Sequence, residues 1–261
     1  MTDARIRAAT DGLVVQMGAD GELDNTFGDG GTARFDIPSG SDDDQPRVAH
    51  DDTGRTVVAF ASSAGNSWAS VARFDLAGTR DTTFGTGGVA SVDASVPVWA
   101  MAGGVSVELV GLDSQHRPYV MLRTTYDVGD GPTELAEIVR LTATGDVDPS
   151  YARPDLPGAS VVHLAGDGTA LVHVGTSLRR ILPDGTIDAS FITGAEQVEQ
   201  PLHATIAADG SIVSCGAARC IALTPTGSLD ATFGTAGRVE LPAMPSAALT
   251  DVAVAIDAEP T

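Results

Sequence analysis

An aspartate followed two residues later by Ser or Thr, and then by an aromatic residue, recurs five times in this chain of 261 residues. A carboxylate beside a hydroxyl can transfer protons or help to hold a cation. The shared pattern is G-x-x-D-x-[ST]-[FY], and its members are Gly21/Asp24/Phe27, Gly78/Asp81/Phe84, Gly145/Asp148/Tyr151, Gly185/Asp188/Phe191 and Gly227/Asp230/Phe233. Because a catalytic residue is not needed five times, we expect these aspartates to be structural.

The pattern has a physical explanation as a repeated corner of the backbone. Gly supplies the positive φ that a tight turn requires. The Asp carboxylate and the Ser or Thr hydroxyl can both accept backbone N–H bonds. The aromatic ring is the one large apolar group of the corner. We expect it to wedge between neighbouring repeats, with burial contributing about 2–3 kcal/mol for each ring.

Cys215 and Cys220 are the only cysteines, and they flank the sequence GAAR. In a hairpin they would face one another across adjacent strands. A disulfide closing so short a loop would contribute about 2 kcal/mol, and two buried free thiols are the alternative. A zinc set is not expected, because no second pair of ligands exists. A disulfide would favour an oxidising compartment.

Three residues are candidates for ligand contact. His163 and His203 fall on strands that would line a central channel, and Trp99 could form a stacking platform at its mouth. For each of them packing within the protein is the simpler interpretation. The acidic run 42–44 lacks the alternate spacing of calcium ligands, so a solvated loop is expected there. The sequence has no P-loop and no G-x-S-x-G. We therefore expect no metal, no cofactor and no catalytic residue.

The segments between corners alternate apolar and polar residues in twos, which predicts short β-strands. Examples are 55–60, 106–112, 160–165, 169–174, 211–215 and 220–224. The aromatic residues of successive corners are 57, 67, 40 and 42 residues apart, and most of these spacings are typical of propellers or solenoids. An all-β unit of about four strands, repeated, is a propeller blade. Residues 132–141 resemble a helix but hold the place of a strand in the repeat.

We therefore predict an all-β protein with one domain, 1–261, forming a five-bladed β-propeller. In one cycle the corner leads to a fourth strand such as 88–93. The ring would be closed because the first strand of a blade, 249–256, pairs with the second and third strands of that blade, 4–12 and 13–21. The expected blade boundaries are 30–83, 86–150, 152–190, 193–232, and 235–261 joined with 1–27.

A longer form of the corner, G-x-x-D-x-[ST]-F-G-x-x-G, fits 21–31 and 78–88, and 227–237 differs only in having Ala236 before its last Gly. Together with the preceding apolar-Arg-apolar strand, it resembles the delta-60 repeat. That resemblance implies a β-propeller from a bacterial protein, often a large and surface-associated one, and it implies no activity. Tyr151 and Phe191 lack the Gly that follows the ring in the family pattern, which leaves the geometry of those two corners open.

Charge excludes some partners. The net charge is −20, the isoelectric point is about 4.3, and all fifteen basic residues are Arg. Nucleic acid is not an expected partner, because its phosphates are neutralised by Lys and Arg, and an anionic membrane surface is disfavoured for the same reason. No apolar run is long enough to span a membrane. The N-terminus lacks the apolar core of a signal peptide.

We expect a non-catalytic binding or scaffolding module that acts as a monomer on an unknown protein or glycan, at the cell surface or outside the cell. The alternative is an enzyme acting on glycans through carboxylates at the channel mouth. The inner strands are mostly apolar, with Arg47 and Asp251 as the main exceptions, which argues against catalysis. A purely structural repeat domain is the third possibility.

Overall fold

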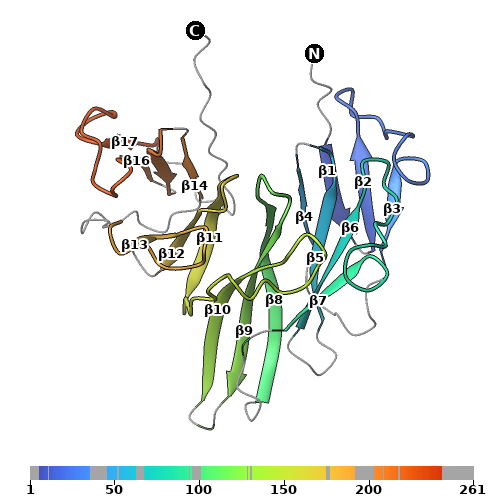
Figure 1. Ribbon diagram of the computed structural model, residues 1–261. Helices are drawn as coiled ribbons and strands as arrows, with labels where there is room; N and C mark the ends of the chain where they lie inside the picture. The colour runs from blue at the N-terminus through green and yellow to red at the C-terminus, as the bar shows by residue number, and fades with distance from the viewer. Residues whose placement is uncertain are drawn as a thin grey trace. The chain divides into compact units, whose positions relative to one another are not determined.

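The protein is described by a computed structural model (Figure 1). The residues that it describes are 6–10, 12–35, 46–51, 53–62, 68–93, 95, 101–127, 129, 131–174, 177–191, 203–207, 209–216 and 218–242. They form seventeen strands in five antiparallel sheets, which confirms the all-β class. In this part of the chain no helix has the length and apolarity to cross a membrane.

The chain divides into two compact units, Met1–Pro157 and Gly158–Thr261, and each is described by itself. The first unit holds three sheets. Their strands are β1 (Ile6–Thr10), β2 (Leu13–Met17) and β3 (Thr32–Arg34) in the first; β4 (Arg47–His50), β5 (Thr56–Ser62), β6 (Trp68–Phe74) and β7 (Val89–Asp93) in the second; and β8 (Met101–Leu112), β9 (Pro118–Asp127) and β10 (Pro132–Arg140) in the third. Residues 132–141, the segment with helical character, are thus largely a strand.

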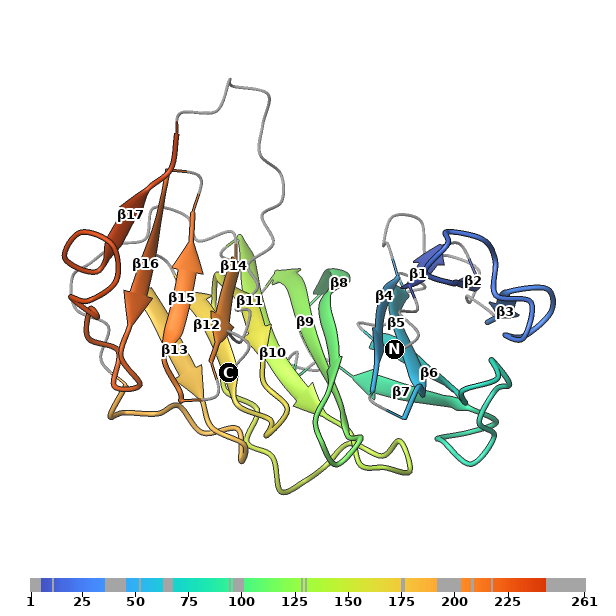
Figure 2. The same ribbon diagram turned by 90° about the horizontal axis from the view of Figure 1, so that it is seen from above.

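The second unit holds two sheets, which Figure 2 shows in yellow to red. Their strands are β11 (Ala159–Leu164), β12 (Ala170–Val174) and β13 (Ser177–Ile181) in the fourth; and β14 (His203–Ile206), β15 (Ile212–Cys215), β16 (Arg219–Leu223) and β17 (Arg238–Glu240) in the fifth. In all five sheets each strand pairs with the next strand along the chain. This up-and-down order needs only short connections.

Each corner follows the strand that would be third in a full sheet and reverses the chain. In the second sheet the N–H of Gly78 bonds the carbonyl of Asp75, and Gly78 has φ +77°. The N–H of Phe84 then bonds the carbonyl of Asp81, and that of Gly88 bonds the carbonyl of Phe84. These turns return the chain to the edge of the strand that it has just left.

The expected blade boundaries at 30, 86 and 235 are wrong. They assign the strand after each corner to the next blade, whereas β3 pairs with β2, β7 with β6, and β17 with β16. The physical reason is the tightness of the corner, which leaves no length for a crossing to another sheet. The sheets therefore cover 6–34, 47–93, 101–140, 159–181 and 203–240.

The two corners that lack the later glycines behave differently from the other three. After Tyr151 the chain runs without strand pairing to Leu156, whose N–H bonds the carbonyl of Ala136 on β10. After Phe191 the chain leaves the described residues at 192. Within the described part, only the corners continued by G-x-[GA]-G (28–31, 85–88 and 234–237) are followed by a fourth strand.

Neighbouring sheets within a unit pack against each other through apolar faces. Phe27, Phe35, Phe60 and Phe74 join the first and second sheets in one buried cluster. Buried Val, Ala and Leu residues, with Phe84, join the second and third sheets. In the second unit Leu171, Phe191, Ile221 and their neighbours join the fourth and fifth sheets. The expected pairing of 249–256 with 4–12 lies outside the described residues, since 243–261 are not among them.

Candidate functional site

The corner aspartate is held by the hydroxyl residue two positions later. In the second sheet Asp81 Oδ1 accepts the backbone N–H of Thr83 at 3.1 Å and its hydroxyl at 2.6 Å. The same pair of bonds joins Asp148 to Ser150, Asp188 to Ser190 and Asp230 to Thr232, at 2.6–2.9 Å. One carboxylate oxygen is therefore committed to the turn in every case, and the other oxygen is left to bind elsewhere.

In three corners the second oxygen binds an arginine that lies eight residues earlier on the adjoining strand. Arg73 Nε lies 2.9 Å from Asp81 Oδ2, and its Nη2 lies 2.8 Å from the same atom. Arg140 and Asp148 repeat these contacts at 2.9 and 2.8 Å, and Arg180 and Asp188 at 2.8 and 2.6 Å. We call this arrangement of arginine, aspartate, hydroxyl and ring the corner cluster.

The arginine of the corner cluster also covers the aromatic ring. The guanidinium carbon lies 4.4 Å from the centroid of Phe84, 4.9 Å from that of Tyr151 and 4.8 Å from that of Phe191. These distances are in the range of a cation–π contact. The three rings are buried, with 0, 4 and 7 % of their surface exposed. Each guanidinium is therefore held between a carboxylate and a buried ring.

The corner cluster ties one sheet to the next within each unit. Arg73 Nη1 donates to the carbonyl of Ala143 at 2.7 Å, and Arg180 Nη1 donates to that of Pro225 at 2.7 Å. Both acceptors belong to the corner turn of the following sheet. The N–H of Gly85 also reaches that turn, at the carbonyl of Thr144, 2.7 Å away. The cluster thus acts as a fastener between repeats.

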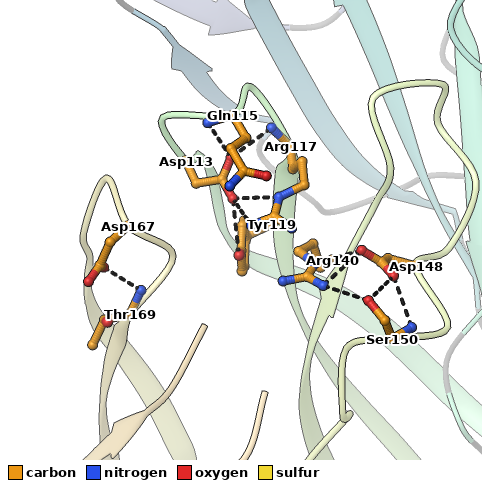
Figure 3. Close-up of polar contacts among 9 residues, drawn as sticks. All are labelled: Asp113, Gln115, Arg117, Tyr119, Arg140, Asp148, Ser150, Asp167 and Thr169. Carbon is orange, nitrogen blue, oxygen red and sulfur yellow. Dashed lines mark hydrogen bonds and ion pairs between the residues drawn. The ribbon is translucent and has the colours of Figure 1, made fainter. Parts of the chain in front are cut away.

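Figure 3 shows the corner cluster of the third sheet with a second polar group beside it. Asp113, with 3 % of its surface exposed, accepts Arg117 Nε at 2.7 Å and lies 3.3 Å from the hydroxyl of Tyr119. Burial raises the pKa of Tyr119, and a hydrogen bond with Arg140 opposes it. Because Tyr119 is fully buried, this hydroxyl cannot meet a substrate and instead holds the two turns in register.

Hydrogen bonds keep the corner aspartates ionised. The Thr83 hydroxyl, ahead of the charge of Arg73, lowers the pKa of Asp81 despite burial. The Ser190 hydroxyl, followed by Arg180, lowers the pKa of Asp188 to about 2. Burial raises the pKa of Asp148, but Ser150 and Arg140 outweigh it and the net direction is down. A group with so low a pKa is a poor general acid near neutral pH.

The first corner reaches the same arrangement by a different route. Gln16 stands eight residues before Asp24, and its Nε2 donates to Asp24 Oδ2 at 2.6 Å. The guanidinium comes from the facing strand, where Arg7 donates to Gln16 at 2.6 Å and lies 5.2 Å from the centroid of Phe27. Arg7 also donates to the carbonyl of Gly54 in the second sheet at 2.7 Å.

The fifth corner has no such cation among the described residues. Ala222 occupies the position eight residues before Asp230. The contacts of the Asp230 carboxylate within the described part are the two bonds from Thr232, both to Oδ1. The Phe233 ring is only half-buried, in contrast to the other four rings. The fifth corner therefore has the carboxylate and the ring of the cluster without its arginine.

A second feature that the sequence did not reveal joins the second and third sheets. His116 has φ +60° at a turn position that is Gly54 in the second sheet, Gly168 in the fourth and Gly210 in the fifth. Its Nδ1 lies 2.8 Å from Asp51 Oδ2. A histidine in the left-handed region is uncommon, and this contact between sheets offsets part of the strain.

Cys215 and Cys220 form a disulfide with an S–S distance of 2.01 Å. The two residues face each other in the register of β15 and β16. Between the alternatives left open by the sequence, the structure has the bonded pair. The loop that it closes is already held by the bond from Gly216 N–H to the carbonyl of Arg219.

The three ligand candidates are not brought together by the described residues. Trp99 and the acidic run 42–44 lie outside them. His163 is on β11, half-buried, and His203 begins β14. His173, on the facing strand β12, has a buried Nε2 without a hydrogen-bond partner in the described part, and burial lowers its pKa. In that part no three His, Cys, Asp or Glu side chains gather as a metal would require.

Comparisons with known proteins give one likeness of low similarity. No protein-family model matches the chain, and no curated protein matches it. Among solved structures it is similar to one titled "Streptogramin B lyase structure", with 14 % identity and a TM-score of 0.39, over 94 % of this chain and 82 % of that one. At this level of similarity no conclusion about activity follows.

Proposed function

We propose that this chain is a non-catalytic binding or scaffolding module built on a five-bladed β-propeller. Five sheets carrying the same corner, and the face-to-face packing of successive sheets within each unit, support this architecture. The resemblance of the corners to the delta-60 repeat points in the same direction.

Closure of the ring is part of the proposal. By their position relative to the corner, β1, β2 and β3 correspond to β5, β6 and β7, so the first sheet has no counterpart of β4 among the described residues. Segment 249–256 has the alternating pattern of such a strand. A strand from one end of the chain paired with strands from the other closes a propeller and protects its sheet edges.

The use of the charged groups is the observation that carries the non-catalytic proposal. The repeated Arg–Asp pairs bind turns and rings, and their carboxylates are held ionised. Such groups stabilise a rigid frame, and rigid frames present variable loops for recognition. An unknown protein or glycan is the proposed partner. The disulfide supports a location in an oxidising compartment, at the cell surface or outside the cell.

The glycan-acting alternative depends on carboxylates near the inner strands. Glu108 lies on β8, and Glu134 lies on β10. Arg123 contacts both, at 3.4 and 2.6 Å. Two carboxylates that share one guanidinium form an ion-pair network across three strands, whereas a glycosidase needs one carboxyl group to be protonated. The observation therefore favours binding over hydrolysis.

A binding panel combined with a hydrolysis assay tests the proposal. The purified protein is immobilised and exposed to polysaccharides and to basic and acidic peptides, and release of reducing sugar is measured in parallel. We expect saturable binding without release of sugar. Sugar release that Glu108→Gln abolishes would establish the enzyme instead, and a complete absence of binding would leave the purely structural domain.

Ring closure is tested by engineered cysteines. Alignment of 249–256 with β4 places Val254 opposite Ala8, as Val48 is opposite Val58. We expect the pair Ala8→Cys and Val254→Cys to form an intramolecular disulfide, detected by peptide mass mapping beside the native one. The control pair Ala8→Cys and Ala253→Cys has its second thiol on the opposite face and is expected to stay reduced. Equal reactivity of both pairs, or bonding only between chains, would contradict closure.

A further inference from the structure

The fifth corner is an incomplete copy of a site that the same chain builds elsewhere. In three sister corners a guanidinium lies between the carboxylate oxygen Oδ2 and the ring, 2.6–2.9 Å from the oxygen and 4.4–4.9 Å from the ring centroid. In the fifth corner Ala222 replaces the arginine, and Phe233 is half-buried where the sister rings are covered. The sister corners therefore define which chemical group fits.

The charge at this corner is unbalanced within the described residues. Asp230 donates none of its oxygens to a cation there, and its carboxylate is fixed by the Thr232 hydroxyl and N–H. Asp209 in the turn between β14 and β15 is close enough for the two carboxylates to repel each other. The hydroxyl of Ser211 and its N–H hold Asp209 in turn, at 2.6 and 2.9 Å. An added cation would relieve this repulsion.

The rest of the chain offers few cations to fill the site. Residues 243–261 contain no Arg, Lys or His. Of the fifteen arginines, only Arg5 lies outside the described residues. The net charge of −20 attracts basic segments of other proteins and raises their rate of encounter.

We propose that the fifth corner, made of Asp230, Phe233 and Thr232, is a docking site for an arginine side chain of a partner protein. The partner guanidinium would pair with Asp230 Oδ2 and stack on Phe233, as Arg73, Arg140 and Arg180 do in their own corners. Arginine is favoured over lysine because its planar fork binds a carboxylate and a ring face together. This inference rests on the proposed binding function and names the partner chemistry of one surface.

The test uses two probe peptides, acetyl-Gly-Arg-Gly-Arg-Gly-amide and its lysine counterpart, titrated into the full chain labelled with ¹⁵N. We expect the amide signals of Thr232 and Phe233 to shift with the arginine peptide, and the lysine peptide to bind at least about fivefold more weakly. Asp230→Asn should weaken binding about tenfold or more. Asp29→Asn, which removes the same charge from an exposed position in the first corner, should leave it unchanged.

Ala222→Arg provides a second, independent test. It supplies the missing guanidinium from the chain itself, so we expect it to abolish peptide binding and to raise the melting temperature. Arg5→Ala should bind the peptide as the parent chain does; tighter binding would mean that Arg5 occupies the site, which overturns the partner proposal. Binding that neither Asp230→Asn nor Ala222→Arg reduces would also overturn it, while leaving the broader binding function intact.

Discussion

Phe84→Ala removes a ring that has no exposed surface and lies in the apolar cluster between the second and third sheets. Truncating a buried Phe costs about 3–5 kcal/mol, from lost transfer energy and from the cavity left behind. The substitution also removes the cation–π contact with Arg73, 4.4 Å from the ring centroid, which adds about 0.5–2 kcal/mol. We therefore expect a loss in the upper half of the range, about 4–5 kcal/mol.

Phe233→Ala is the matched control, because this ring is half-buried and has no arginine over it among the described residues. Its expected cost is about 1–2 kcal/mol. Urea unfolding followed by circular dichroism measures both values. If Phe84→Ala does not fold, Phe84→Leu at about 1–2 kcal/mol takes its place. A loss below about 1 kcal/mol for Phe84→Ala, or equal losses for the two alanine variants, would refute a fastening role for the ring.

Three further predictions follow from the corners and the hairpin. Gly145→Ala should cost about 1–3 kcal/mol or more, because φ is +92° and a Cβ there would lie 2.7 Å from the backbone N of Gly85; Gly21→Ala, at φ +82° with open space around it, should cost only about 1 kcal/mol in the same unfolding assay. The pKa of Asp188, lowered to about 2 by Ser190 and Arg180, adds stability that is present above the unfolded value of about 3.9 and lost as the pH falls through about 2, so Asp188→Asn should flatten the unfolding free energy between these pH values. Reduction of the Cys215–Cys220 disulfide, checked by thiol titration, should lower stability by about 2 kcal/mol with little change in circular dichroism, and a collapse of the signal would contradict the prediction.

Much of the local structure could be predicted because it depends on short-range chemistry. The alternation of apolar residues identified the strands, including the segment 132–141 that has helical character. Gly78 and its counterparts marked the turns, since only a residue without Cβ adopts positive φ at low cost. The Asp and Ser or Thr of each corner bond to one another within two residues, so spacing alone suggested that contact.

Other features depend on groups that meet only after folding. The arginine of the corner cluster lies on an adjoining strand, and although its spacing of eight residues was visible in the sequence, nothing in the spacing revealed the carboxylate and the ring that share it. In the first sheet the same role falls to Arg7 on the facing strand, which no repeat alignment would show. The pairing of β7 with β6 overturned the expected blade boundaries for a similar reason, since strand partners are chosen by the geometry of the connection.

The sequence by itself thus determined the strands, the five corners and the internal bonds of each turn, because the energies involved act between residues close along the chain. Only the tertiary structure decided which sheet receives each fourth strand, which cation covers each ring, and which corner keeps a half-exposed ring and an unpaired carboxylate oxygen. These outcomes depend on burial and on contacts between distant segments, and burial exists only once the sheets have packed.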